Sequence, residues 1–322
     1  MSGVVLGFDT SNYRTSVAAV TEDGEALLNL RLLLPVREGE RGLRQSDAVF
    51  IHLRQMKELT ERIRQELDGC PLSAVAASVR PRNHPDSYMP VFQVGETIGR
   101  VLAAAEGIPF YATDHQSGHV RAAACGTQLA DADAFLALHL SGGTTELLEK
   151  RGDTLEMIGG TLDLHAGQLV DRAGVAMGLP FPAGPELEKL ALQGHSEGRL
   201  GCSMAEGDLR CHFSGAETRV QGWIREGKLP REDIAREIYD LLSRTVFRML
   251  EAGRKKTGLR QALIAGGVAA SPLLRELLTA RCTRVLRGPE PVFGRAEYSG
   301  DNAVGVALIG AARLRREKEN GG

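Results

Sequence analysis

The sequence predicts an α/β protein made of two halves that are built alike. Over 4–20, an apolar run, a turn of polar residues and a second apolar run form the pattern of two antiparallel strands. The same layout returns over 135–148, where the turn consists of small and hydroxyl residues. A matched repeat of this kind, with helical patterns between its copies, predicts two lobes of similar construction.

Length and composition agree with two folded lobes. The chain has 322 residues, which is more than one hydrophobic core usually serves, and 43% of them are hydrophobic. We expect an N-terminal lobe over 1–130 and a C-terminal lobe over 131–302, and 303–322 can pack back on the first lobe. The five cysteines never occur in C-x-x-C spacing, and no basic leader or apolar run of membrane-spanning length is present. The expectation is a soluble, cytoplasmic protein without a membrane segment.

Two helices are expected between the first strand pair and the next strand. The first begins with Ser46 as its cap and stops at Gly69, and the second covers 94–106. His52 lies on the first of them and is interpreted as structural or exposed. The apolar face of that first helix is predicted to carry Phe50, Leu53, Leu59, Ile63 and Leu67.

A candidate metal site follows the strand at 108–112. Thr113 or Asp114 can cap a helix on which His115 and His119 lie four residues apart, so that both imidazoles share one face. A capped, hydrogen-bonded helix start would explain the pair equally well. A third, oxygen ligand would have to come from elsewhere, and Asp301 in a Ser-Gly-Asp-Asn turn is the candidate. The three residues together predict one divalent metal ion, with iron or zinc as the expected choices.

The turn of the second strand pair is a candidate phosphate site. Small residues leave backbone N–H groups free to approach a phosphate closely, although an ordinary hairpin turn is an equally good interpretation of this turn alone. The residues of the turn are Ser141, Gly142, Gly143, Thr144 and Thr145.

The C-terminal half adds helices and a second glycine-rich turn. Helices are expected over 165–177, 185–192 and 232–251. A strand at 262–265 leads through Gly266 and Gly267 to a helix that Ser271 caps, with proline in its first position. A glycine pair between strand and helix lets a nucleotide approach the helix N-terminus, but it is a weak signal by itself.

Charge predicts no general affinity for nucleic acid. The net charge is −2 and the pI is near 6.5, so an RNA partner would need a local basic patch. One candidate patch is Arg80 and Arg82, which flank a proline. Solvated surface is the favoured interpretation of this pair, because arginine side chains are mostly exposed.

Eight segments, in this order and spacing, resemble a known family. They are GFDTSNYRTS at 7–16, TDHQSGH at 113–119, LSGGTTEL at 140–147, GTLDLHAGQLVDRAG at 160–174, LPFPAGPELEKLA at 179–191, HFSGAET at 212–218, AGGVAAS at 265–271 and SGDNA at 299–303. This set resembles the TsaD family, formerly labelled O-sialoglycoprotein endopeptidase, of the actin-like, sugar-kinase and heat-shock-chaperone ATPase superfamily. The resemblance implies two RNase-H-like lobes around a nucleotide cleft.

The resemblance also implies a reaction and its ligands. The family transfers a threonylcarbamoyl group from threonylcarbamoyl-AMP to an adenine amine of tRNA next to the anticodon. On this resemblance the metal ligands fall on His115, His119 and Asp301, and the ribose contacts on Asp171 and Gly184. The turn 141–145 matches the phosphate contacts, and Ser271 stands where the family has an asparagine. An ATP- or AMP-type nucleotide, TsaB-like and TsaE-like partner proteins, and a homodimer are further expectations.

Several family residues are replaced in this chain. Tyr13 and Arg14 stand in place of an Asp-Glu pair, so Arg14 could contact a phosphate directly. Leu164 and Gln168 replace two further carboxylates, and Thr144 replaces a histidine. These losses leave a second hypothesis open, in which the chain is a non-catalytic partner or regulator that keeps the fold. Proteolysis is disfavoured because no H-E-x-x-H motif is present, and a sugar kinase would not need the histidine pair.

Overall fold

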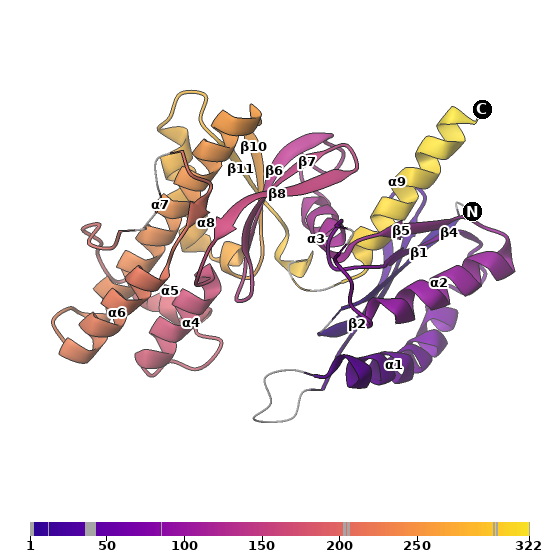
Figure 1. The fold of residues 1–322 in the computed structure, drawn as a ribbon, viewed down its shortest axis with the longest axis horizontal. Helices are drawn as coiled ribbons and strands as arrows, with labels where there is room; N and C mark the ends of the chain where they lie inside the picture. The colour runs from indigo at the N-terminus through magenta and orange to yellow at the C-terminus, as the bar shows by residue number, and fades with distance from the viewer. Residues whose placement is uncertain are drawn as a thin grey trace. The chain divides into compact units, whose positions relative to one another are not determined.

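The computed structural model describes residues 3–11, 13–35, 43–84, 86–201, 204, 207–298, 300 and 302–321. The chain divides into two compact units, which we call unit 1 (Met1–Cys125 and Gly300–Gly322) and unit 2 (Gly126–Ser299). Figure 1 shows the ribbon of both units. Within the described ranges, no helix combines the length and apolar character needed to cross a membrane.

Unit 1 contains a five-stranded sheet. Its strands are β1 (Val4–Thr10), β2 (Arg14–Thr21), β3 (Ala26–Leu33), β4 (Leu72–Ser78) and β5 (Phe110–Thr113). Their order is β3-β2-β1-β4-β5, with β1 antiparallel to β2 and parallel to β4. The strand pair predicted over 4–20 is therefore confirmed, and β3 extends it to a three-stranded meander.

Helices cover both faces of this sheet. Side chains point to alternate faces along each strand, so apolar side chains on both faces need helices to pack against. They are α1 (Gln45–Glu66), α2 (Phe92–Glu106), α3 (His115–Ala124) and α9 (Val304–Asn320). Leu6 and Phe8 of β1 share a core with Met56 of α1 and with α2, whereas Gly7 between them lies against α9. In Figure 1, α9 lies on one side of the sheet, and α1 and α2 lie on the other. β1, β2, β4 and β5 all pack on α9.

The prediction for α1 is wrong in two respects. The helix begins at Gln45, so Ser46 lies inside it and Arg44 takes the cap position without a side-chain hydrogen bond. Phe50 and Leu53 are 62% and 52% exposed, although their spacing suggested a common buried face. The buried face instead carries Ala48, His52, Met56 and Leu59. His52 therefore occupies a position on the buried face where an apolar residue is usual. A prediction from apolar residues alone misses this position and places the buried face wrongly.

Unit 2 contains a six-stranded sheet in the order β11-β10-β6-β7-β8-β9. Its strands are β6 (Ala134–Leu140), β7 (Thr145–Arg151), β8 (Thr154–Thr161), β9 (Arg210–Cys211), β10 (Gln261–Ala265) and β11 (Glu290–Phe293). β6, β7 and β8 form an antiparallel meander, and β10 is parallel to β6. The repeat predicted from the sequence is confirmed, since each unit contains a three-stranded meander beside a parallel strand.

The helices of unit 2 pack into one large core. They are α4 (Ala166–Ala176), α5 (Gly184–Ala191), α6 (Ser214–Glu226), α7 (Arg231–Thr257) and α8 (Pro272–Thr283), with the short 3-10 turns η1 (Val268–Ala270) and η2 (Ala296–Tyr298). α7 contributes the largest share of buried residues and contacts α5 and α8. As predicted, Ser271 caps α8, where its hydroxyl accepts a hydrogen bond from Leu274 N at 3.1 Å.

Two glycines let α3 and α9 pack unusually close in unit 1. A Cβ atom on Gly305 would overlap the carbonyl oxygen of Gly118, and a Cβ atom on Gly118 would lie 3.0 Å from Val306. The backbones therefore touch where these helices cross. This contact sets the position of α3, which carries the histidine pair, against the start of α9.

We expect Gly305→Ala to lower the free energy of unfolding of unit 1 by about 1–3 kcal/mol, because the added methyl group must push α3 away from α9. Urea unfolding measured by circular dichroism would test this. Gly222→Ala in α6 is the control, since a Cβ atom there meets nothing within 4 Å and alanine favours the helix. Equal midpoints for Gly305→Ala and the unchanged protein would contradict the close packing.

Candidate functional site

A buried carboxylate joins three elements at the carboxyl-end edge of the unit 1 sheet. Asp9, near the end of β1, is 1% exposed and accepts a hydrogen bond from the Ser78 hydroxyl at the end of β4. Its two oxygens also lie 2.9 and 3.0 Å from Nδ1 of His115 at the start of α3. Buried carboxylates require such partners, because an unpaired buried charge is costly. Asp9 thus fixes the orientation of the His115 ring.

The two histidines converge as predicted. Asp114 caps α3 by accepting from Ser117 N at 2.9 Å, and the helix then places Nε2 of His119 3.0 Å from Nε2 of His115. Two nitrogens bound to one tetrahedral zinc ion at their usual distance would be about 3.3 Å apart. A carboxylate that accepts from Nδ1–H leaves the Nε2 lone pair of His115 available for a metal. The pair therefore fits a metal ion by distance, and the Asp9 contact favours the required tautomer of His115.

The third predicted ligand, Asp301, lies outside the described residues. Among the residues that the structure does describe, no three His, Cys, Asp or Glu side chains form a group able to hold a metal. The neighbours of Asp301 are described: Asn302 is buried, donates to Gly300 O at 2.7 Å and accepts from Val304 N at 3.1 Å. Asn302 therefore orders the turn that leads into α9.

A second buried histidine supports the turn between β1 and β2. His52 of α1 is fully buried, donates from Nε2 to Ser11 O at 2.9 Å and bonds through Nδ1 to the Thr15 hydroxyl at 2.7 Å. Burial lowers the pKa of His52 to about 4, although the bond to Ser11 acts in the opposite direction. The ring is therefore neutral at pH 7, and it holds both ends of the turn that carries Tyr13 and Arg14.

The turn predicted to bind phosphate lies against the N-terminus of α4 in unit 2. Gly167 N donates to Ser141 O at 3.1 Å, and Ala166 N donates to the Thr145 hydroxyl at 2.9 Å. Gly142 and Gly167 are in backbone contact, where a side chain on Gly167 would collide. Gly143 is exposed and Thr144 half-buried. The turn therefore presents backbone groups, while the Thr145 hydroxyl accepts a hydrogen bond from the first residue of α4.

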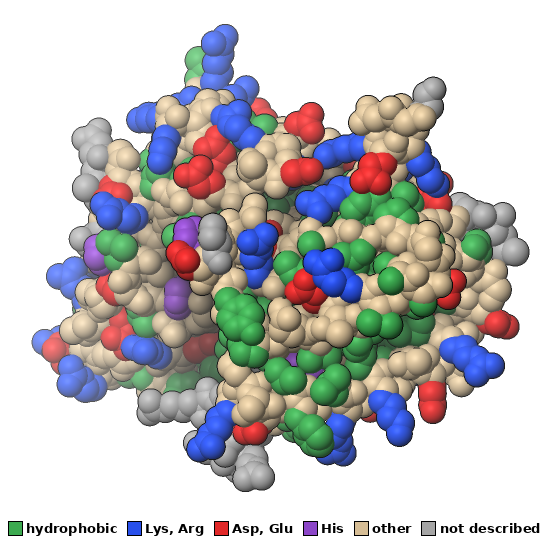
Figure 2. All heavy atoms as spheres, turned by 45° about the vertical axis from the view of Figure 1, so that its right-hand side comes forward, with side chains coloured by type: hydrophobic (Ala, Val, Ile, Leu, Met, Phe, Trp, Pro, Cys, Tyr) green, Lys and Arg blue, Asp and Glu red, His purple; other side chains and the backbone are tan. Residues whose placement is uncertain are grey.

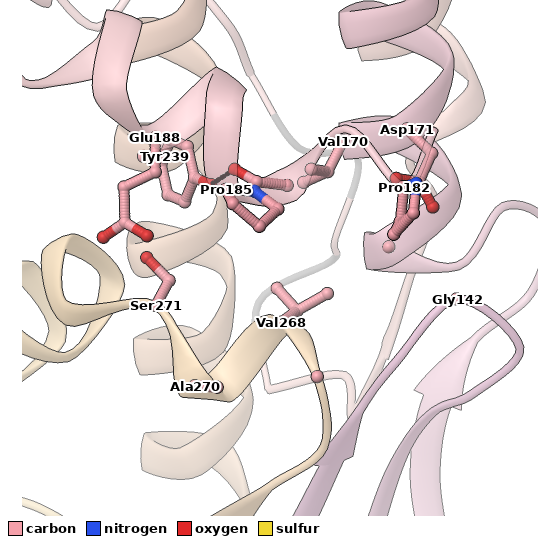
Figure 3. A pocket seen from close by; sticks show the side chains of 13 residues that line it. Gly142, Val170, Asp171, Pro182, Pro185, Glu188, Tyr239, Val268, Ala270 and Ser271 are labelled. Carbon is pink, nitrogen blue, oxygen red and sulfur yellow. Dashed lines mark hydrogen bonds between the residues drawn. The ribbon is translucent and has the colours of Figure 1, made fainter. Parts of the chain in front are cut away.

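Unit 2 also contains a cavity of about 390 Å³, which is large enough for a nucleoside. It is formed by the 141–145 turn, α4, α5, α7 and the segment after β10, as Figure 3 shows. The five predicted nucleotide contacts outside the 141–145 turn line the cavity or support it. Asp171, Gly184, Gly267 and Ser271 line the cavity, and Gly142 is the residue of the 141–145 turn that does so. Gly266 lies behind them with a φ of +104°, packed against Leu140 O, where only glycine fits.

The cavity contains two polar residues that the sequence did not predict. Glu188 of α5 accepts from Leu273 N in the first turn of α8 at 2.7 Å, and Tyr239 of α7 donates to Gly184 O at 3.1 Å. Figure 3 shows both side chains near Ser271 and Pro185. Burial, and then the charges of Glu188 and Asp171, raise the pKa of Tyr239 above its ordinary value, so its hydroxyl stays protonated. Both residues occupy ordinary positions within the helices α5 and α7. Nothing in the sequence therefore distinguished them as cavity residues.

Asp171 is oriented by the backbone. Its Oδ1 accepts from Ala183 N at 2.8 Å, and within the described part of the chain its Oδ2 has no hydrogen-bond donor. On the opposite side of the cavity from Asp171, Figure 3 shows Glu188. A carboxylate with one oxygen held by the protein can accept from a ribose hydroxyl with the other.

The replaced family residues have different environments. Tyr13 is 66% exposed, whereas Leu164 is buried in the core of unit 2. Gln168 accepts from His165 N at 3.1 Å at the start of α4. Leu164 and Gln168 therefore have structural roles. Arg14, in contrast, adds a positive charge at the sheet edge where the histidine pair lies.

The two units together have the actin-like ATPase fold. Component A of the (R)-2-hydroxyglutaryl-CoA dehydratase from Acidaminococcus fermentans is 15% identical, with a TM-score of 0.56 over 98% of this chain and 100% of that chain. A ROK family glucokinase from Streptomyces griseus, solved with glucose and AMPPNP, is 14% identical, with a TM-score of 0.54 over 96% and 100%. At this identity the likenesses show the fold alone, and they confirm the predicted fold class.

Sequence similarity identifies the family. The sequence model for TsaD, tRNA N6-adenosine threonylcarbamoyltransferase, matches residues 52–308. A tRNA N6-adenosine threonylcarbamoyltransferase from Chlorobium luteolum is 30% identical over 97% of this chain and 94% of that protein. The chain belongs to the TsaD family, which confirms the resemblance seen in its motifs.

The lowered pKa of His52 predicts a pH-dependent stability. The unfolded chain binds a proton at this residue below its ordinary pKa of 6.5, while the folded chain does so only near 4, so stability falls as the pH drops between these values. We expect His52→Gln to remove about 1–2 kcal/mol of the stability difference between pH 7 and pH 5. Urea unfolding at both pH values would measure it, with His84→Gln, an exposed histidine, as the control. The same pH dependence in His52→Gln and the unchanged protein would contradict the assignment.

Proposed function

We propose that this chain transfers a threonylcarbamoyl group from threonylcarbamoyl-AMP to the N6 amine of an adenine next to the anticodon of tRNA. The observation that carries the proposal is the histidine pair, whose Nε2 atoms lie 3.0 Å apart while Asp9 holds one ring. Membership of the TsaD family supports the reaction class. A structural helix start alone would not need two facing ring nitrogens and a buried carboxylate behind them.

The cavity of unit 2 is proposed to bind the AMP part of the donor. Asp171 would accept from ribose hydroxyls through Oδ2, and Gly184 leaves room for the sugar, because a Cβ atom there meets only Val170, at 3.8 Å. Tyr239 and Ser271 line the same cavity and supply hydroxyl groups. The backbone of Ser141–Thr145 and of Gly267, with Gly266 behind them, would cradle the phosphate.

His115, His119 and Asp301 are proposed to hold one divalent metal ion, for which iron or zinc is the expected choice from two imidazoles and one carboxylate. Such an ion, when bound, polarises a carbonyl oxygen and stabilises the negative charge that develops on it. Asp9 would contribute by keeping the proton of His115 on Nδ1.

The transfer needs no oxidant or reductant. The adenine amine attacks the carbamoyl carbon, a C–N bond forms, and the bond from that carbon to the phosphate oxygen breaks. AMP leaves with the electron pair, and the amine loses one proton to solvent or to the departing phosphate. Because AMP is an adequate leaving group, much of the rate enhancement can come from positioning.

Binding of tRNA is proposed to depend on partner proteins of the TsaB-like and TsaE-like kinds. Basic and acidic side chains are interspersed on the face shown in Figure 2, and the net charge of the chain is −2. A single chain of this charge has little general attraction for a polyanion. A homodimer of this chain would also have a net negative charge, and it would therefore have equally little general attraction for tRNA.

A second candidate function is that of a non-catalytic partner in a tRNA-modification complex. Its support is the turn between β1 and β2, where an exposed Tyr13 and the cation Arg14 replace a family Asp-Glu pair. Loss of two carboxylates changes the charge near the histidine pair and removes groups able to transfer protons.

We expect about one divalent metal ion per purified chain, and its loss in the double variant His115→Ala/His119→Ala, because both facing nitrogens are removed. Asp9→Asn should weaken metal binding by about 10–100-fold through loss of the ring's carboxylate partner. Elemental analysis and zinc titration would measure both effects, with exposed His84→Ala as the control. Full metal content in the double variant would rule out this site.

The reaction can be reconstituted directly. Incubation with tRNA, threonine, bicarbonate, ATP and the enzyme that makes threonylcarbamoyl-AMP should produce the modified adenosine, detected by mass spectrometry of tRNA digests. Asp171→Ala should lower kcat/KM about tenfold or more by removing the ribose contact, whereas Glu186→Ala on the exposed face of α5 should not. No product, even with partner proteins present, would favour the non-catalytic function.

A further inference from the structure

Two arginines of unit 1 emerge at the sheet edge where Asp9 and His115 lie. Arg14 is the first residue of β2, and Arg80 follows β4, so that they come from the two strands that flank β1. Because neighbouring strands are about 5 Å apart, their backbones are separated by roughly 10 Å. Both side chains are half-buried.

Arg80 is bonded through its backbone to the first residue of α3, and its side chain has a buried Nε atom without an acceptor among the described residues. Its carbonyl oxygen accepts from His115 N at 3.0 Å, which places Arg80 directly beside the start of α3. Its Nε atom is buried, and no described group accepts its hydrogen. A buried N–H without an acceptor is rare in folded proteins and commonly marks the place of a missing ligand or water.

Arg14 approaches the same region from the other side of β1. Its Nη1 atom would lie 3.4 Å from a Cβ atom on Gly300, so the guanidinium group rests over the backbone of the turn before α9. Within the described residues, no carboxylate or carbonyl group pairs with it. A side chain at position 300 would therefore reduce the space that the Arg14 guanidinium group occupies.

The described carboxylates near the two arginines already accept hydrogen bonds from other groups. Asp9 accepts from Ser78 and His115, and Asp114 accepts from both the backbone and the hydroxyl of Ser117. The two guanidinium groups therefore have no described carboxylate to neutralise them at this edge. Guanidinium groups form two parallel hydrogen bonds with phosphate or carboxylate oxygens, which makes them the usual residues for such ligands.

We propose that Arg14 and Arg80 form an oxyanion-binding site on unit 1, beside the histidine pair, that accepts a phosphate or a carboxylate group. The proposal goes beyond the transfer reaction, because the site binds its anion whether or not the chain is catalytic. In a transferase the anion would be a phosphate of the RNA or the carboxylate of the threonyl group. In a non-catalytic partner the same site would still bind such a ligand.

Isothermal titration calorimetry with the full-length protein would test the site. The probes are inorganic phosphate, N-acetylthreonine, which carries a carboxylate, and its methyl ester, which does not. We expect one of the two anions to bind, and Arg14→Gln or Arg80→Gln to weaken it about tenfold or more. Arg14→Lys should retain part of the affinity, because it keeps the charge and loses the planar fork. Arg82→Gln, an exposed arginine in the same loop, is the control and should change nothing.

The arms of this experiment separate the sources of the anion. A loss of phosphate binding in both arginine variants identifies a phosphate site, and a loss of N-acetylthreonine binding with no binding of its ester identifies a carboxylate site. Binding that both Gln variants leave unchanged, or binding of the ester equal to that of the acid, overturns the proposal. If His115→Ala/His119→Ala abolishes the binding while Arg14→Gln and Arg80→Gln preserve it, the histidine pair holds the anion and the proposal is wrong. Thermal unfolding of each variant would confirm that it folds.

Discussion

The carboxylate of Asp9 is the constraint on which the arrangement of unit 1 depends. One buried side chain links the end of β1 to Ser78 of β4 and to His115 of α3, so that strand ends and helix start share one hydrogen-bond network. The close crossing of Gly118 and Gly305 then fixes α3 against α9. Polar bonding and small-residue packing together hold the two histidine rings edge-on, with their Nε2 atoms 3.0 Å apart, at little cost in side-chain entropy, because short, buried groups carry the geometry.

Most of the fold could be predicted, since its signals are local. Strand pairs follow from two short apolar runs on either side of a turn, and Ser271 with the following proline marks the start of α8 without reference to any distant residue. The failure at α1 has a tertiary cause: His52 is buried because Ser11 and Thr15, far away in sequence, satisfy both ring nitrogens. A pattern that counts only apolar residues assigns such a histidine to the surface and rotates the predicted face toward Phe50 and Leu53.

The residues of the candidate sites likewise differ in whether the sequence alone could predict them. His115 and His119 could be predicted because one helix turn brings them together, and the Ser141–Thr145 turn because its composition is unusual. Glu188 and Tyr239 could not, because they reach the cavity from different helices and look like ordinary helix residues. The same holds for Arg80, whose buried Nε becomes informative only when the acceptors around it are known.

All 13 residues that line the cavity belong to unit 2, whereas the histidine pair and both arginines belong to unit 1. Substitutions at the β1–β2 turn therefore change none of the described residues that line the cavity. A lineage can replace the acidic pair by Tyr13 and Arg14 and select a new anion there while its nucleotide affinity stays under separate selection. Because the two sets of residues do not overlap, binding of a nucleotide in the cavity and binding of an anion beside the histidines can evolve independently.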